Sequence, residues 1–230
     1  MKDTALSGLS TADMDTYSWR RRLLMACLAI LLYFAVQLVL IFAVGKASTL
    51  WMSISASLVV LLIFAWVERR HSGGVRALVG HDLGNTLKQC APWVLGAYLV
   101  STGLDVGFGY WQEPTPLAGT QSMTKKLLLF AMTLVIISTL EELLYRHFLI
   151  RLFPLGHRRW RYVAILFTTA LYMLMHMPYA HWTNFLLVGT LSIILGYARV
   201  RSAGLLVPVL LHIFAGVLSL LRYFMATLWF

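Results

Sequence analysis

Two adjacent carboxylates and an arginine interrupt a long apolar run near the middle of the chain. Glu141 and Glu142 are followed by Arg146, and all three lie in the otherwise hydrophobic stretch 127–153. An ionised side chain at the centre of a bilayer costs roughly 2.5–3.5 kcal/mol on insertion scales, so acids in such a stretch indicate a functional site. Carboxylates act as general acids and bases, which suits a hydrolytic reaction.

The spacing assigns different tasks to the two acids. Glu142 and Arg146 are four residues apart, which puts them on one face of a helix with the acid nearer the N-terminus. We therefore predict an ion pair that orients and stabilises the site. Glu141 is rotated by one residue and has no cation at this spacing, which leaves it as the predicted general acid or base.

Two histidines in later apolar segments have positions from which they could reach Glu141. With a rise of about 1.5 Å per residue, Glu141 and His176 each lie about 25 Å from the connection near Arg158. His212 lies about 15 Å from the turn at Arg201. These depths are compatible with a single site, although each histidine could instead hydrogen-bond a neighbouring helix.

Other polar residues in or beside apolar segments have simpler explanations. For Gln37 and Asp105 we predict contacts between helices. His147, His157 and His181 lie near helix ends or loops, where structural roles are expected.

The composition indicates a polytopic membrane protein. Of the 230 residues, 60% are hydrophobic and 12% are charged, whereas soluble domains are about 45–50% apolar and about 25% charged. The net charge of +10 does not indicate nucleic-acid binding, because the basic residues cluster in short connections between apolar segments. The two cysteines have neither metal-ligand nor redox spacing.

The hydropathy pattern predicts an all-α transmembrane helix bundle. Seven spans are expected over residues 23–44, 49–67, 91–111, 127–153, 162–177, 182–198 and 205–224. A short interfacial helix is expected between residues 72 and 89. Basic residues concentrate in alternate connections, which predicts a cytoplasmic N-terminus. The expected location is a bacterial inner membrane.

The chain divides into three parts. Residues 1–22 are predicted to be a mobile cytoplasmic tail, and residues 23–126 to hold the first three spans with their loops. Residues 127–225 are predicted to be the catalytic core. A transporter is a competing hypothesis, but the chain lacks the internal repeats that are common in that class.

These motifs resemble those of the CPBP family, the CAAX-processing and bacteriocin-processing membrane proteases, also called the Abi family. The similar residues are Glu141-Glu142-x-x-x-Arg146, Tyr172-x-x-x-His176 and His212. The resemblance covers about residues 127–221. It implies an intramembrane endopeptidase that hydrolyses a peptide bond in a membrane-associated peptide or protein.

The resemblance also implies a role for each residue. Glu141 would activate water with help from His176, and His212 would stabilise the oxyanion of the tetrahedral intermediate. Glu142 and Arg146 would orient the site. The expected enzyme depends on glutamate and holds no metal; the alternative is a zinc ion bound by Glu141, His176 and His212.

Two positions depart from the family pattern. Four residues after the last histidine the family usually has a polar residue, and this chain has Gly216. Loss of one oxyanion donor can cost about 10²–10³ in rate. Tyr172, where the family usually has Phe, and Asn184 are the candidates for an auxiliary role. If neither contributes, the alternative function is a non-catalytic membrane scaffold or immunity factor.

Overall fold

The computed structural model describes residues 18–44, 49–68, 76–110, 122–177 and 181–229, and all regular structure in them is helical. The long helices are α1 (Trp19–Val44), α2 (Thr49–Val67), α4 (Leu83–Phe108), α5 (Met123–Glu142), α6 (Arg158–Met175), α7 (Trp182–Ser202) and α8 (Leu206–Trp229). The short elements are α3 (Arg76–Val79), the π-helix η3 (Leu143–Leu149) and the 3₁₀-helix η4 (Ile150–Leu152). The predicted all-α fold is confirmed.

Several boundaries differ from those expected. The helix predicted to begin at residue 91 begins at Leu83, because the polar, glycine-containing stretch before Cys90 is helical and not a loop. Of the predicted tail, residues 1–17 lie outside the described residues, and Trp19–Arg22 form the first turn of α1. The predicted short helix between residues 72 and 89 corresponds to α3.

Three helical segments in the described residues are long and apolar enough to cross a membrane. They are Trp19–Leu40, Trp182–Ser202 and Leu206–Met225. Large apolar side chains also face outward on the other long helices, and Phe42 on α1 is 85% exposed. Extended apolar surface of this kind requires an apolar environment. The helices therefore fit an integral membrane protein, while a count of seven spans stays a prediction.

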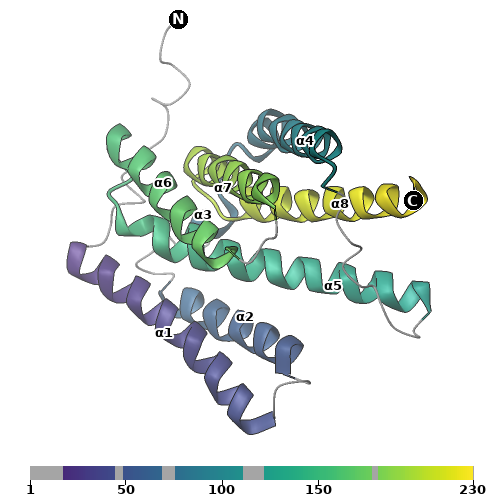
Figure 1. Cartoon of the computed structure of the whole chain (residues 1–230). Coiled ribbons are helices and arrows are strands. Elements are labelled where there is room, and N and C mark those ends of the chain that lie inside the picture. Colours follow the sequence, from purple (N-terminus) through teal and green to yellow (C-terminus); the bar gives the residue numbers. More distant parts are fainter. Residues whose placement is uncertain (1–17, 45–48, 69–75, 111–121, 178–180, 230) are drawn as a thin grey trace, which may run out of the picture.

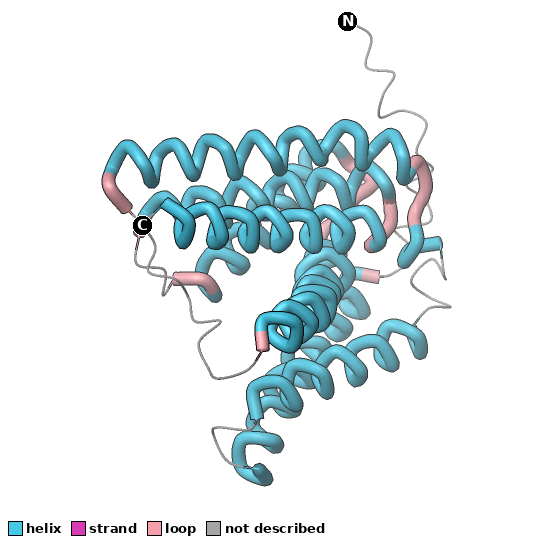
Figure 2. The backbone as a smooth tube through the Cα atoms, turned by 90° about the vertical axis from the view of Figure 1, so that its right-hand side faces the viewer, coloured by secondary structure: helices cyan, strands magenta, loops and turns pink. Residues whose placement is uncertain are grey.

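Helix α5 lies between two groups of helices. Figures 1 and 2 show α1 and α2 on one side and α4, α7 and α8 on the other. Helix α5 contacts α2 and α8, and the π-helix that follows it contacts α1, α2 and α6. The segment with Glu141, Glu142 and Arg146 is therefore surrounded by helices from both halves of the chain.

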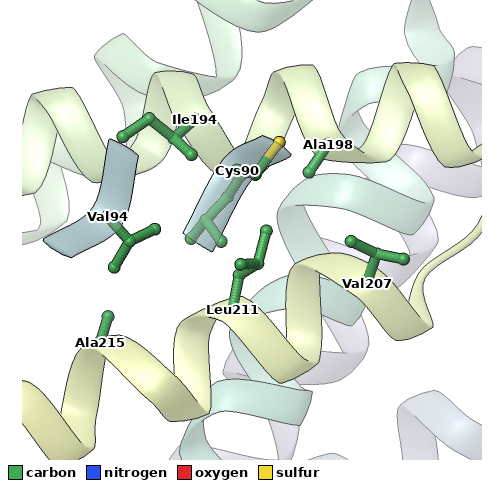
Figure 3. Packing of buried hydrophobic residues seen from close by; sticks show 8 residues of the cluster. Cys90, Val94, Ile194, Ala198, Val207, Leu211 and Ala215 are labelled. Carbon is green, nitrogen blue, oxygen red and sulfur yellow. The ribbon is translucent and has the colours of Figure 1, made fainter. Parts of the chain in front are cut away.

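A buried apolar cluster fixes α8 against α4 and α7. Buried apolar residues of all three helices interdigitate in this cluster, which is shown in Figure 3. Cys90 and Val94 come from α4, Ala198 from α7, and Val207 and Leu211 from α8. Because Leu211 is almost completely buried, the backbone at the next residue, His212, has a defined position.

Polar contacts within the bundle join the same helices. Asp105 on α4 accepts hydrogen bonds from Thr183 on α7 and Arg222 on α8. Gln37 on α1 donates to the Ser57 hydroxyl on α2 at 3.2 Å. The predicted helix–helix contacts of Asp105 and Gln37 are both confirmed.

Two glycines allow the chain around α3 to touch the α7–α8 turn. The N–H of His81 donates to the carbonyl of Ser202 at 2.8 Å, and the N–H of Leu205 donates to the carbonyl of Leu78 at 2.8 Å. A Cβ atom on Gly80 would lie only 2.6 Å from the Cα of Gly204, and one on Gly204 would overlap the Gly80 backbone. Side chains are therefore excluded at both positions.

We expect Gly204→Ala to lower the free energy of unfolding by about 1–3 kcal/mol or more, the cost of forcing extra atoms into a packed site. The measurement is thermal unfolding of the purified protein in detergent. The matched control is Gly96→Ala, where an added Cβ meets nothing within 4 Å and α4 should become slightly more stable. Equal unfolding temperatures for Gly204→Ala and the wild type would contradict the close backbone contact.

Candidate active site

Helix α5 ends at the two glutamates and continues as a π-helix. Leu143–Leu149 is almost entirely buried. The π-helix is a rare conformation that occurs frequently at functional sites. The departure from α-helical geometry thus begins directly after Glu142 and includes Arg146.

Glu142 and Arg146 form the predicted ion pair, with Arg146 Nη1 at 3.2 Å from Glu142 Oε1 and both side chains 0% exposed. His212 on α8 contacts the same oxygen through Nδ1 at 2.9 Å. An ionised carboxylate only accepts hydrogen bonds, so His212 Nδ1 carries a proton here. Glu142 therefore connects the end of α5 to α8.

Glu141 is the more accessible of the two acids, with 23% of its side chain exposed. Its Oε2 accepts a hydrogen bond from the Tyr172 hydroxyl at 2.7 Å. The same oxygen lies 3.7 Å from Nε2 of His212. Glu141 thus contacts polar groups from both α6 and α8, while it keeps access to its surroundings.

Tyr172 contacts both Glu141 and His176. The Tyr172 and His176 rings lie 4.3 Å apart, and the Arg146 guanidinium lies 5.0 Å from the centre of the Tyr172 ring. His176 Nδ1 hydrogen-bonds the backbone carbonyl of Tyr172 at 2.8 Å. A carbonyl only accepts, so Nδ1 donates and Nε2 is the nitrogen of His176 that can take up a proton.

The two candidates for an auxiliary role differ in their positions. The Tyr172 hydroxyl reaches Glu141 directly. Asn184 lies in the first turn of α7, where its backbone N–H donates to the His181 carbonyl at 3.2 Å. It is about 12 Å along α7 from Ser192, a residue that contacts the ion pair. Tyr172 therefore has a direct hydrogen bond to Glu141, and Asn184 is placed here only by its position in α7.

Gly216 faces α5. A Cβ atom at this position would overlap the side chain of Leu134. A polar side chain at position 216 would therefore require Leu134 to move. The space one helical turn after His212 is filled by an apolar residue and not by a hydrogen-bond donor.

Two residues of α7 for which the sequence predicts no role in the site contact Arg146. The hydroxyl and the carbonyl of Ser192 accept hydrogen bonds from Arg146 Nη2 at 2.9 and 3.3 Å. Arg199 Nε donates to the Arg146 backbone carbonyl at 2.7 Å. Arg199, expected in a basic connection after residue 198, lies instead inside α7 and is fully buried. A serine in an apolar run and an arginine at its end carry no distinctive sequence signal.

The zinc alternative requires Glu141, His176 and His212 to converge on one ion. Within the described residues, no group of three or more His, Cys, Asp or Glu side chains could hold a metal ion. The Tyr172 hydroxyl donates a hydrogen bond to Oε2 of Glu141, and the Tyr172 carbonyl accepts one from Nδ1 of His176.

The part of the chain that carries this site is similar to known proteins. The family model described as "Type II CAAX prenyl endopeptidase Rce1-like" matches residues 123–218, from the start of α5 to the middle of α8. An uncharacterized 24.3 kDa protein of Escherichia coli is 29% identical over 194 residues, which cover 80% of this chain and 85% of that protein. No solved structure matches the chain. The resemblance found in the motifs is confirmed: residues 123–218 are a domain of the Rce1-like type II CAAX prenyl endopeptidase family.

Proposed function

We propose that the protein is an intramembrane endopeptidase in which Glu141 activates water to hydrolyse a peptide bond of a membrane-associated substrate. One observation carries this proposal. The Glu141 carboxylate is partly exposed and contacts Tyr172 and His212, whereas Glu142 beside it is buried and paired with Arg146. One acid is therefore available to move a proton, while the other orients its neighbours.

In this mechanism the water oxygen adds to the carbonyl carbon of the peptide, and a proton of the water passes to Glu141. His212 Nε2, when protonated, and the Tyr172 hydroxyl are donors suited to the oxyanion that forms. The C–N bond then breaks, and the proton returns from Glu141 to the leaving nitrogen. His176 Nε2 is available as a relay, because Nδ1 is occupied by the Tyr172 carbonyl.

Glu142 and Arg146 act as orienting residues. Glu142 Oε1 accepts from His212 Nδ1, which fixes the tautomer and the direction of the ring. Arg146 neutralises Glu142 in a site that excludes water. Together, Glu142 and Arg146 keep His212 Nε2 directed toward Glu141.

The proposal includes a location in the bilayer. We place the seven long helices as spans of a bacterial inner membrane with the N-terminus in the cytoplasm, following the distribution of basic residues. The substrate is a peptide segment at or within the membrane. The name of the matching family refers to prenylated substrates, and that class is the first to test.

The test uses the full chain in lipid vesicles. Peptides with a prenylated C-terminal cysteine, and the same peptides unmodified, are incubated with the wild type and with Glu141→Gln, and the products are identified by mass spectrometry. We expect defined fragments from the wild type only, and no loss of activity with a chelator. Equal cleavage by both proteins would overturn the proposal. A loss of cleavage activity with the chelator that added zinc reverses would mean that the reaction depends on a metal ion.

We expect Tyr172→Phe to lower kcat by about 10²-fold with KM nearly unchanged, the magnitude for removal of one donor to the oxyanion. Only the hydroxyl is lost, so the ring contact with His176 should remain. The matched control is Tyr197→Phe, whose hydroxyl bonds Gln89 elsewhere in the bundle and which should keep wild-type activity. A Tyr172→Phe protein with the kcat of the wild type would exclude the hydroxyl from the reaction.

A further inference from the structure

The side chain of Arg146 contacts α7 as well as Glu142. Its Nη1 pairs with Glu142, and its Nη2 donates to the hydroxyl and the carbonyl of Ser192. Hydrogen bonds from a guanidinium are charge-assisted and stronger than those between neutral groups. The direction of the guanidinium is therefore set from two helices.

The backbone carbonyl of Arg146 also accepts a hydrogen bond from α7. In an α-helix the N–H of Ile150 would donate to the carbonyl of Arg146, four residues earlier. Here it donates to the carbonyl of Tyr145 instead, which is the five-residue pattern of a π-helix. The Arg146 carbonyl thus loses its α-helical donor, and Arg199 Nε supplies a hydrogen bond to it at 2.7 Å.

Ser192 and Arg199 act from one face of α7. They are seven residues apart, close to two helical turns, so their side chains lie above one another. Both are buried, and the two terminal nitrogens of Arg199 have no hydrogen-bond partner within the described residues. A buried guanidinium is costly when it is poorly paired, and Arg199 directs its Nε hydrogen bond to the Arg146 carbonyl.

We propose that Ser192 and Arg199 are positioning residues, which hold the π-helical turn so that Arg146 and Glu142 keep His212 in its catalytic orientation. This inference rests on the proposed function. The contacts run from Ser192 and Arg199 to Arg146, from Arg146 to Glu142, and from Glu142 Oε1 to His212 Nδ1. Both residues act through Arg146.

The first test measures kcat and KM of vesicle-reconstituted variants on a cleaved peptide. We expect Ser192→Ala and Arg199→Gln each to lower kcat about tenfold with KM within twofold, and Arg199→Lys to restore much of the loss, because an ammonium can also donate to the carbonyl. One control is Thr190→Ala, whose hydroxyl donates to the Leu186 carbonyl of its own helix. The other is Arg201→Gln, which contacts Gln89, Tyr197 and Asp82. Losses in KM alone, or equal losses in Arg199→Gln and Arg199→Lys, would overturn the proposal.

The second test needs no substrate, so its failure is distinct from a failure of the proposed function. Ser192→Ala and Arg199→Lys are made in the wild type and in Arg146→Met, and thermal unfolding is measured in detergent. If Ser192 acts through the Arg146 guanidinium, Ser192→Ala lowers the unfolding temperature of the wild type but not of Arg146→Met. Arg199→Lys, which acts on the backbone, shifts both by similar amounts. Equal shifts for Ser192→Ala in the two backgrounds would overturn the side-chain contact, and with it the proposal.

Discussion

Glu141→Gln is expected to lower peptide hydrolysis by about 10³-fold, within the range for loss of a general base. Glutamine has nearly the same shape as glutamate, and its amide oxygen can still accept the hydrogen bond from Tyr172. It cannot take a proton from water. The loss should therefore appear in kcat, while KM and the unfolding temperature stay close to those of the wild type.

The matched control is Glu68→Gln. Glu68 directly follows α2 and pairs with Arg21 on α1 at 3.3 Å. Loss of a partly exposed ion pair costs roughly 0–1 kcal/mol, and activity should not change. Rates of Glu141→Gln within a few-fold of the wild type, in protein shown to be folded, would remove Glu141 from the mechanism.

Arg146→Met is expected to give the largest loss of stability, about 3–5 kcal/mol, because it leaves the Glu142 charge buried without its cation. Glu142 is 0% exposed, and its Oε2 has no hydrogen-bond partner within the described residues. The unfolding midpoint in a denaturing detergent titration measures the effect. Hydrolysis should also fall, because Glu142 is no longer fixed by Arg146 and can no longer orient His212.

The double variant Glu142→Gln, Arg146→Met separates stability from chemistry. With both charges removed, much of the lost stability should return, since replacing a whole buried pair is far less costly than breaking it. Hydrolysis should stay low, because His212 Nδ1 no longer has a carboxylate partner. Additive losses in the double variant would mean that the two side chains do not interact.

The sequence predicts those features of the fold that depend on neighbouring residues, such as an apolar run or a four-residue spacing. Helix α2 has the predicted bounds, 49–67, because an apolar run there is bounded by turn residues and by charges. The Glu142–Arg146 pair follows from a four-residue spacing. The start of α4 at Leu83 was missed, because polar residues and Gly84 obscure an amphipathic turn whose buried member is Thr86.

The parts of the site that could not be predicted depend on tertiary contacts. An apolar run over 127–153 gives no sign that its helix widens into a π-turn after Glu142. The hydrogen bond from the buried Arg199 to the Arg146 carbonyl joins residues 53 positions apart, and no spacing in the sequence encodes it. For Tyr172, the sequence predicts its place in the motif. The direction of its hydroxyl cannot be predicted, because it depends on how α6 packs near α5.

The contact between Gly80 and Gly204 makes the minimal folding unit larger than the recognisable family domain. Truncation to residues 123–218 would remove the partners of the Ser202 carbonyl and the Leu205 N–H. It would also strip α4 from the faces of α7 and α8 that it covers through Cys90 and Val94. We therefore expect such a fragment to be insoluble in mild detergent and degraded in cells, whereas a fragment that begins before α3 and keeps α4 retains these contacts.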